Sequence, residues 1–205
     1  MSHMDVPTLT FRAVAAASRP VVRRRFDLDA RGIEHLPRGG FVLCANHVSA
    51  LDAWALSAPL YPRQPRYMAK AELFARPVLR SLLRRIGLFP VARGRCCVTA
   101  IATAIGHARA GRIVVIFPEG SRRKESEQPE PRAGAAFVAL AADVPLVPAA
   151  VSGTAHPLGR WRVAFGAPVD VADLAGTRTS TAAREATRRL WRRIAELEEE
   201  LSCSA

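Results

Sequence analysis

The sequence lacks any apolar run as long as the roughly 18 residues that a membrane-spanning helix requires. We also expect no signal peptide, because the early apolar stretch at residues 13–17 is short and arginines soon follow it. Together these features predict a chain that is soluble or lies on a surface.

Cysteine is scarce, and its four positions form neither a C-x-x-C pair nor a disulfide framework. The expected state is reduced thiols in a cytoplasmic protein, with no metal site. The four are Cys44, Cys96, Cys97 and Cys203.

Aromatic and acidic residues are also few. Aromatic side chains make up 6% of the chain, and 18 acidic residues stand against 30 lysines and arginines, for a net charge of +12. This balance predicts an anionic partner: nucleic acid, an anionic membrane, or a phosphorylated or coenzyme-type substrate. Nucleic acid is disfavoured, because there are few aromatics for base stacking and no nucleic-acid module signature.

The length of 205 residues and the hydrophobic content of 49% predict one globular domain with a substantial core. Residues 1–4 are interpreted as a cloning remnant. Residues 5–25 are expected to form a basic amphipathic segment interrupted at Pro20. Residues 26–180 form the main domain, and residues 181–205 a C-terminal helix that packs on it.

Short apolar runs bounded by glycine or proline predict strands, and apolar stripes at helical spacing predict helices. Their alternation predicts an α/β protein, a single layered domain with a central mixed, mostly parallel sheet flanked by helices. The expected strands are residues 26–30, 41–45, 66–69, 113–117, 145–151 and 161–165, and the expected helices are residues 11–22, 52–56, 77–86, 97–110, 134–142 and 181–201.

The most informative stretch is residues 46–52 (Asn-His-Val-Ser-Ala-Leu-Asp), directly after the apolar strand 41–45. Ser49 and Asp52 fit a capping box, which predicts Ser49 as the N-cap and Asp52 as the third helical residue. Helical side chains lean toward the N-terminus, so Asp52 would point at the turn that carries His47. A carboxylate there can hold one imidazole nitrogen and leave the other as a base. The alternative is that Asp52 only caps its helix and His47 has no catalytic role.

A second polar stretch, residues 117–123 (Phe-Pro-Glu-Gly-Ser-Arg-Arg), follows the plainest strand at its carboxyl end. Ligands bind at this end of open α/β sheets. Glu119 and Arg122 could face a polar substrate there, with Arg122 offering a planar fork to a phosphate. The alternative is a solvated turn with a Glu–Arg surface pair.

Four sequence blocks, in this order, resemble the glycerolipid acyltransferase family, typified by 1-acylglycerol-3-phosphate O-acyltransferase. Asn46-His47 followed by Asp52 resembles the catalytic N-H-x-x-x-x-D block. Residues 70–74 leading into 87–93 are similar to the second block, and residues 117–122 to the third. Residues 147–151 resemble the fourth, although the family more often has a residue larger than Ala149 there.

The resemblance implies a glycerol-3-phosphate acyltransferase-like fold and transfer of a fatty acyl group to a lysophospholipid hydroxyl. The donor would be acyl-CoA or acyl carrier protein. The expected acceptor is 1-acylglycerol-3-phosphate, which would give phosphatidic acid, and no metal or prosthetic group is implied. The alternatives are another lysolipid or a glycolipid as acceptor, a non-catalytic lipid-binding module, and a thioesterase-like hydrolase in which His47 activates water.

The resemblance also implies residue roles. His47 would act as the base and Asp52 would fix its tautomer, with backbone amides after Ser49 as candidate oxyanion donors. The implied substrate-binding residues are Asn46, Ser49, Arg93, Glu119, Gly120, Ser121 and Arg122.

Two basic and apolar segments, residues 11–25 and 77–86, are expected to bind an anionic membrane surface. The expected location is therefore peripheral, on the inner face of the cell membrane.

Overall fold

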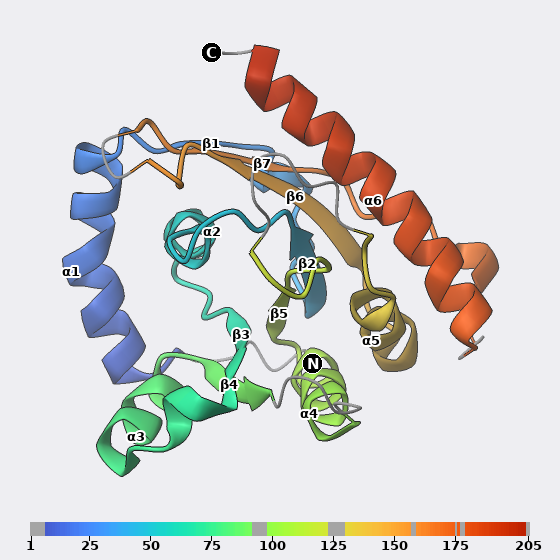
Figure 1. Ribbon diagram of the computed structural model, residues 1–205, viewed down its shortest axis with the longest axis horizontal. Helices are drawn as coiled ribbons and strands as arrows, with labels where there is room; N and C mark the ends of the chain where they lie inside the picture. The colour runs from blue at the N-terminus through green and yellow to red at the C-terminus, as the bar shows by residue number, and fades with distance from the viewer. Residues whose placement is uncertain are drawn as a thin grey trace.

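The fold is built on a seven-stranded sheet with the order β1-β7-β6-β2-β5-β3-β4 (Figure 1). The computed structural model describes residues 7–91, 98–122, 130–156, 159–174, 176 and 179–203. Five strand pairings are parallel and one, between β6 and β7, is antiparallel. The predicted fold class is therefore confirmed. The strands are β1 (Asp29–Arg31), β2 (Phe41–Ala45), β3 (Arg66–Lys70), β4 (Leu88–Val91), β5 (Ile113–Ile116), β6 (Leu146–Ser152) and β7 (Arg162–Phe165).

Strand β2 lies at the centre of the sheet, between β5 and β6. Leu43 is in register with Val115 of β5 on one side and with Val147 of β6 on the other. Every residue of β2 is buried, because helices cover both faces of the sheet. This double burial explains why the strand reads as an uninterrupted apolar run.

Helices form a layer on each face of the sheet (Figure 1). On one face, the residues of β2 that alternate from Phe41 pack with α1 (Leu9–Arg25) and α2 (Asp52–Leu60). On the other face, Val42 and Cys44 pack with α4 (Val98–Arg109), α5 (Gly134–Ala142) and α6 (Ser180–Cys203). Helix α3 (Pro77–Arg85) lies beside β4. The described residues also form three short 3₁₀ helices: η1 (Ile33–His35), η2 (Ala71–Phe74) and η3 (Ala172–Leu174).

Two local predictions need correction. The first helix is not interrupted at Pro20 but continues to Arg25. Proline removes the hydrogen bond to the carbonyl of Ala16, yet both residues are exposed, so water can satisfy that carbonyl. Residues 88–91, which were not expected to be a strand, form the edge strand β4. Its proline, Pro90, is tolerated because an edge strand has one unpaired side.

No helix in the described ranges combines the length and apolarity needed to cross a bilayer. The apolar stripe of α6 (Leu190, Ile194, Leu197 and Leu201) is buried against this chain's own sheet.

Candidate active site

The predicted catalytic turn leaves the carboxyl end of the central strand β2. The exits of β5, β6 and β3 surround it, because these strands lie on either side of β2 and run parallel to it. Strand order reverses here: the chain moves from β2 toward β3 on one side and later to β6 on the other. This is the position at which open α/β sheets bind their ligands.

His47 and Asp52 form a direct pair in this turn. His47 Nδ1 donates a hydrogen bond to Asp52 Oδ2 at 2.8 Å, and the Asp52 side chain is completely buried while the His47 side chain keeps 18% of its surface exposed. A neutral imidazole that donates through Nδ1 carries its lone pair on Nε2. Nε2 has no hydrogen-bond partner in the described part of the chain, so it is available as a base.

The carboxylate of Asp52 is held from several directions. Its Oδ2 also accepts the backbone N–H groups of Val48 and Ser49, each at 2.9 Å. Its Oδ1 accepts the hydroxyl of Thr154, a buried residue in the turn after β6. Asp52 is also the first residue of α2, where the helix dipole favours a negative charge.

The predicted capping box is half formed. The Asp52 side chain accepts the Ser49 N–H, as a capping box requires. The Ser49 hydroxyl, however, accepts the N–H of Leu51 instead of the N–H of Asp52. The helix therefore begins at Asp52 rather than after Ser49, and Asp52 is the first helical residue, not the third.

The face of the His47 imidazole rests on Phe117 at the exit of β5. The two ring centroids lie 4.0 Å apart and the planes differ by 14°. Asp52 thus fixes one edge of the imidazole and Phe117 fixes its plane, so the two contacts together restrict rotation of the ring.

Glu119, predicted to face a polar substrate, lines neither of the cavities described below. It is buried, and its Oε1 accepts the backbone N–H of His47 at 3.1 Å. The structure therefore joins the two predicted polar stretches: the turn after β5 holds the backbone of the turn after β2. The alternative of a solvated Glu–Arg surface pair is also wrong, because Glu119 is not exposed.

Asn46, also predicted to bind substrate, makes hydrogen bonds to the backbone of Val151. Its side-chain amide donates to the carbonyl of Val151 at 2.9 Å, and its Oδ1 accepts the Val151 N–H at 2.7 Å. Asn46 is buried, so both polar atoms serve this link between the exits of β2 and β6.

Ser49 and the start of α2 offer less than predicted. Ser49 lines neither of the cavities described below, and its N–H belongs to Asp52. The N–H of Val48 also belongs to Asp52, and that of Leu51 to the Ser49 hydroxyl. These amides are therefore not free oxyanion donors.

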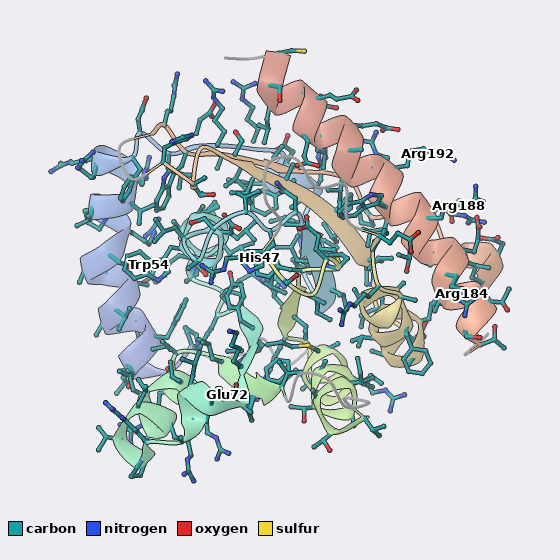
Figure 2. The ribbon with its side chains drawn as sticks, in the orientation of Figure 1. His47, Trp54, Glu72, Arg184, Arg188 and Arg192 are labelled. Carbon is teal, nitrogen blue, oxygen red and sulfur yellow. The ribbon has the colours of Figure 1, made fainter. Side chains whose placement is uncertain are left out.

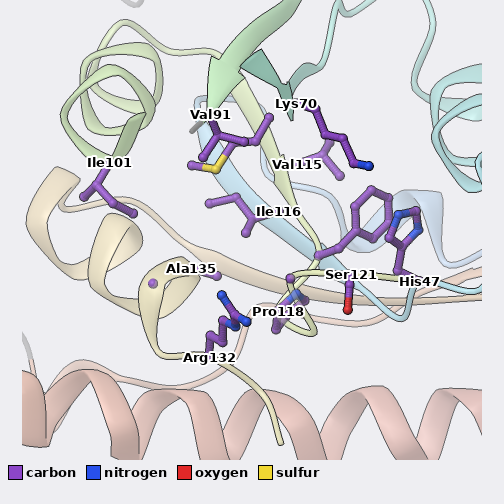
Figure 3. Close-up of a pocket in the computed structure, with 14 residues that line it drawn as sticks. His47, Lys70, Val91, Ile101, Val115, Ile116, Pro118, Ser121, Arg132 and Ala135 are labelled. Carbon is purple, nitrogen blue, oxygen red and sulfur yellow. The ribbon is translucent and has the colours of Figure 1, made fainter. Parts of the chain in front are cut away.

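His47 borders two cavities, which share Met68, Lys70 and Phe117; the second is lined by Arg19 and Arg122 as well. The first, which we call the cationic cavity, measures about 620 Å³ and is shown in Figure 3. Lys70 at the exit of β3, Ser121 after β5 and Arg132 before α5 bring its polar atoms. Its remaining walls are largely apolar, from the sheet and the first turns of α4 and α5; they are Met68, Val91, Ile101, Val115, Ile116, Phe117, Pro118, Gly120, Gly134 and Ala135.

Gly120 shapes this cationic cavity. Its φ of +73° is in the left-handed region, and a Cβ at this position would lie 2.9 Å from Arg132 Nε. Glycine therefore permits both the turn and the close approach of the Arg132 side chain. Gly120 and Ser121, two of the residues predicted to bind substrate, line this cavity.

The second cavity, which we call the apolar groove, measures about 600 Å³ and runs between α1, α2 and α3. Helix α1 is held across it, because Arg19 Nε donates to the carbonyl of Ala58 in α2 at 3.2 Å. At the other end of α1, the N–H of Thr8 donates to Gln64 Oε1 at 3.0 Å. The lining includes Phe11, Val14, Ala15, Val22, Ala53, Trp54, Tyr67, Leu73, Leu83, Ile86 and Leu88.

Arg122 does not join Arg132 in the cationic cavity. It is exposed and lines the apolar groove. Arg93 lies outside the described residues.

Two buried groups near the site stay protonated. Burial raises the pKa of the Cys44 thiol, two residues before Asn46, far above its usual value. Burial, and to a smaller extent the charge of Asp52, raises the pKa of the Tyr67 phenol, which donates to the carbonyl of Ala53. Neither group competes with His47 as a nucleophile or base near neutral pH.

Sequence reasoning missed two contributors to the site. Thr154 lies in a turn with no recognisable motif, and no spacing rule connects it to Asp52. Arg132 lies outside the four sequence blocks, and its place in the cavity depends on α5 packing beside β5. Only the order of the strands brings either residue to the site.

Comparison with known proteins places this site in a family. The sequence matches the family model described as Acyltransferase over residues 27–152. The 1-acyl-sn-glycerol-3-phosphate acyltransferase of Bacillus subtilis (strain 168) is 33% identical over 197 residues, which cover 93% of this chain and 98% of that protein.

More distant relatives agree. The 1-acyl-sn-glycerol-3-phosphate acyltransferase of Streptococcus pneumoniae (strain ATCC BAA-255 / R6) is 29% identical over 140 residues, covering 65% of this chain and 52% of that protein. Among solved structures, the 1-acyl-sn-glycerophosphate (LPA) acyltransferase PlsC of Thermotoga maritima matches with a TM-score of 0.68 at 21% identity. That match covers 92% of this chain and 81% of the Thermotoga chain, and it supports the fold.

Proposed function

This chain belongs to the Acyltransferase family and is an acyltransferase, and we propose that it acylates the free hydroxyl of a lysophospholipid. The expected acceptor is 1-acylglycerol-3-phosphate, which would give phosphatidic acid. The acyl donor is a thioester, either acyl-CoA or acyl carrier protein.

One observation carries this proposal. His47 of the His47–Asp52 pair borders both cavities, and Lys70 lines both beside it, so a single base can reach a molecule that has a charged part and a long apolar part. A lysophospholipid and a fatty acyl thioester both have this character.

The proposed reaction needs one base and no covalent enzyme intermediate. His47 Nε2 removes the proton of the acceptor hydroxyl as its oxygen attacks the thioester carbonyl carbon. The new carbon–oxygen bond forms and a tetrahedral oxyanion results. When this collapses, the carbon–sulfur bond breaks, and the thiolate takes the proton from the His47 imidazolium. Asp52 holds Nδ1 throughout and stabilises the imidazolium.

For the acceptor phosphate we propose the cationic cavity, with Lys70 and Arg132 as its ligands. Arginine can bind a phosphate through two parallel N–H groups, and lysine adds a point charge. Arg122, at the boundary of the apolar groove, and Arg93, of the second block, remain candidates for the same phosphate or for the phosphates of the donor. The apolar groove would take an acyl chain.

We further propose that the rim of the apolar groove docks on an anionic membrane, as a peripheral protein on the inner face of the cell membrane. Helices α1 and α3 carry arginines and no acidic residue. Apolar side chains are exposed on these two helices and on the neighbouring α2 and η2, namely Leu9, Val14, Val21, Trp54, Leu73, Val78, Leu79 and Leu82. Trp54 lies between α1 and the site in Figure 2.

A product analysis tests the proposal. Purified protein is incubated with acyl-CoA or acyl carrier protein thioester, with 1-acylglycerol-3-phosphate, a monoacylglycerol lacking the phosphate, or no acceptor, and lipids are identified by mass spectrometry. Phosphatidic acid formed only with the phosphorylated acceptor is the expected result. Free fatty acid released equally in all three would establish a hydrolase, and equal acylation of the monoacylglycerol would remove the phosphate assignment.

A further inference from the structure

Thr154 makes a contact to the catalytic pair that its position in the sequence does not suggest. It is separated from Asp52 by 102 residues, yet its hydroxyl donates to Asp52 Oδ1 at 2.5 Å. Its exposed fraction is 1%, and it lines neither the cationic cavity nor the apolar groove as the described residues form them. Thr154 therefore touches the pair without touching the space for substrate.

The two oxygens of Asp52 are held in different ways. Oδ2 accepts three donors, and all of them come from the turn at residues 47–49. Oδ1 accepts the Thr154 hydroxyl, which comes from a different element. Donors to Oδ2 alone fix the position of one oxygen but leave the carboxylate plane free to rotate about it. The Thr154 hydroxyl supplies the second point that fixes this plane.

The turn that carries Thr154 is itself anchored. Gly153 has a φ of +79°, and a side chain there would collide with the carbonyl oxygen of Arg160. Three residues before Thr154, Val151 is bound through both of its backbone groups by Asn46. The exit of β6 is thus tied to the catalytic turn on both sides of His47, once through Asn46 and once through Thr154.

We propose that Thr154 is a positioning residue for acyl transfer: its hydroxyl orients the Asp52 carboxylate, which in turn orients His47. Without the hydroxyl, a buried carboxylate oxygen loses its donor and the carboxylate turns in search of another. The imidazole then spends less time with Nε2 directed at the acceptor. The effect falls on turnover and not on substrate binding. This inference rests on the proposed role of His47 as the base.

The test replaces Thr154 with valine, which keeps the shape of the side chain but removes the hydroxyl. We expect kcat to fall by about 10- to 100-fold, a size typical of lost partners behind an active-site group, with the KM of both substrates within about twofold of wild type. Thr154→Ser keeps the hydroxyl and should restore kcat to within about threefold. Thr154→Ala replaces the valine variant if that protein does not fold.

A matched control and a double-mutant cycle separate positioning from general stability. Thr187 in α6 is also buried, and its hydroxyl donates to the carbonyl of Ala183. Thr187→Val therefore removes another buried hydroxyl and its hydrogen bond, at a residue that lines neither cavity. It should lower the unfolding temperature and leave kcat unchanged. In an Asp52→Asn background, Thr154→Val should lower kcat by no more than about threefold, because the residue it orients has already been altered.

The outcomes are distinct. Full activity in Thr154→Val, or an undiminished effect in the Asp52→Asn background, would overturn the positioning role while leaving the proposed function intact. Full activity in His47→Ala would instead remove the proposed base, and the role of Thr154 with it.

Discussion

The two helical layers of this protein are packed in opposite ways. Helices α4, α5 and α6, which we call the tight layer, bury alanines at 0–7% exposure together with larger residues such as Leu190 and Ile194. Helices α1, α2 and α3 with η2, which we call the open layer, leave the apolar groove between them. Helix α3 has no buried residue, and α1 buries only Phe11, Ala15 and Val22 of its 17 residues.

This difference indicates a division of labour. Alanine lets helices approach closely, so the tight layer contributes dense packing and a firm support for the sheet. It reaches the site only with the first turns of α4 and α5, at the cationic cavity. The open layer gives up packing to provide a groove and an exposed apolar rim. Stability and lipid binding should therefore respond to different substitutions.

The catalytic turn lies between the two layers and should separate chemistry from stability most sharply. We expect His47→Ala to lower kcat by roughly 10²- to 10⁴-fold, the range for loss of a positioned base. The unfolding temperature should change little, because the imidazole is partly exposed and Asp52 Oδ2 keeps the backbone N–H groups of Val48 and Ser49. A thiol-release assay and thermal unfolding measure the two effects, and His156→Ala, at an exposed histidine outside both cavities, is the control. A near wild-type rate would rule His47 out as the base.

The interior of the tight layer should show the opposite result. Leu190 is fully buried, so Leu190→Ala leaves a cavity and should lower the free energy of unfolding by about 2–5 kcal/mol. For a chain of this size each kcal/mol corresponds to about 2–4 °C in Tm. Leu82→Ala, on the exposed face of α3, should change the free energy of unfolding by less than about 0.5 kcal/mol. Equal losses in the two variants would contradict the division between the layers.

Much of this architecture could be predicted from the sequence. The apolar runs of β2, β5 and β6 predict the layered α/β fold that the structure has, and the position of His47 five residues before Asp52 predicts a candidate catalytic turn. Local patterns carry this information because strand burial and helix capping depend on near neighbours in the sequence.

The roles of Asn46, Glu119 and Thr154 could not be predicted in this way. Each depends on which strands are neighbours in the sheet. Asn46 meets Val151 because β2 pairs with β6, and Glu119 meets the His47 backbone because β5 pairs with β2. Polar residues in a recognised block suggest substrate binding, but the buried side chains of Asn46 and Glu119 bind the backbone at the end of a neighbouring strand. The predicted break at Pro20 and the omission of β4 have a simpler cause, because both features depend on which side of the backbone faces solvent.

The cationic cavity offers a smaller effect that sharpens the comparison on the binding side. If Lys70 and Arg132 hold the acceptor phosphate, Arg132→Gln should raise the KM of the acceptor far more than that of the donor. A charge-assisted hydrogen bond contributes roughly 1.5–3 kcal/mol, which corresponds to about 10- to 150-fold in affinity. Arg132→Lys should recover part of this loss.

Two matched variants give this measurement its contrast. Arg184→Gln removes an exposed charge from the outer face of α6 (Figure 2) and should leave both KM values unchanged. Arg122→Gln asks whether the arginine at the apolar groove belongs to the acceptor or the donor. An acceptor KM indifferent to Arg132→Gln but raised by Arg122→Gln would move the phosphate to the arginine named by the sequence motif.

The smallest expected effect concerns the membrane rim of the open layer. Arg84 is exposed on α3, the helix that also exposes the apolar residues Val78 and Leu82. A basic residue near an anionic bilayer contributes on the order of 1 kcal/mol. Arg84→Gln should therefore weaken binding to vesicles containing anionic lipid by about fivefold. Raising the salt concentration should weaken binding of the wild type as well, because the Debye length falls to about 8 Å at physiological ionic strength and to about 3 Å at 1 M. Arg184→Gln makes the same change of charge on the tight layer and should bind as the wild type does. Vesicle flotation measures all three proteins, and equal weakening by the two substitutions would mean that net charge, rather than the open layer, directs the protein to the membrane.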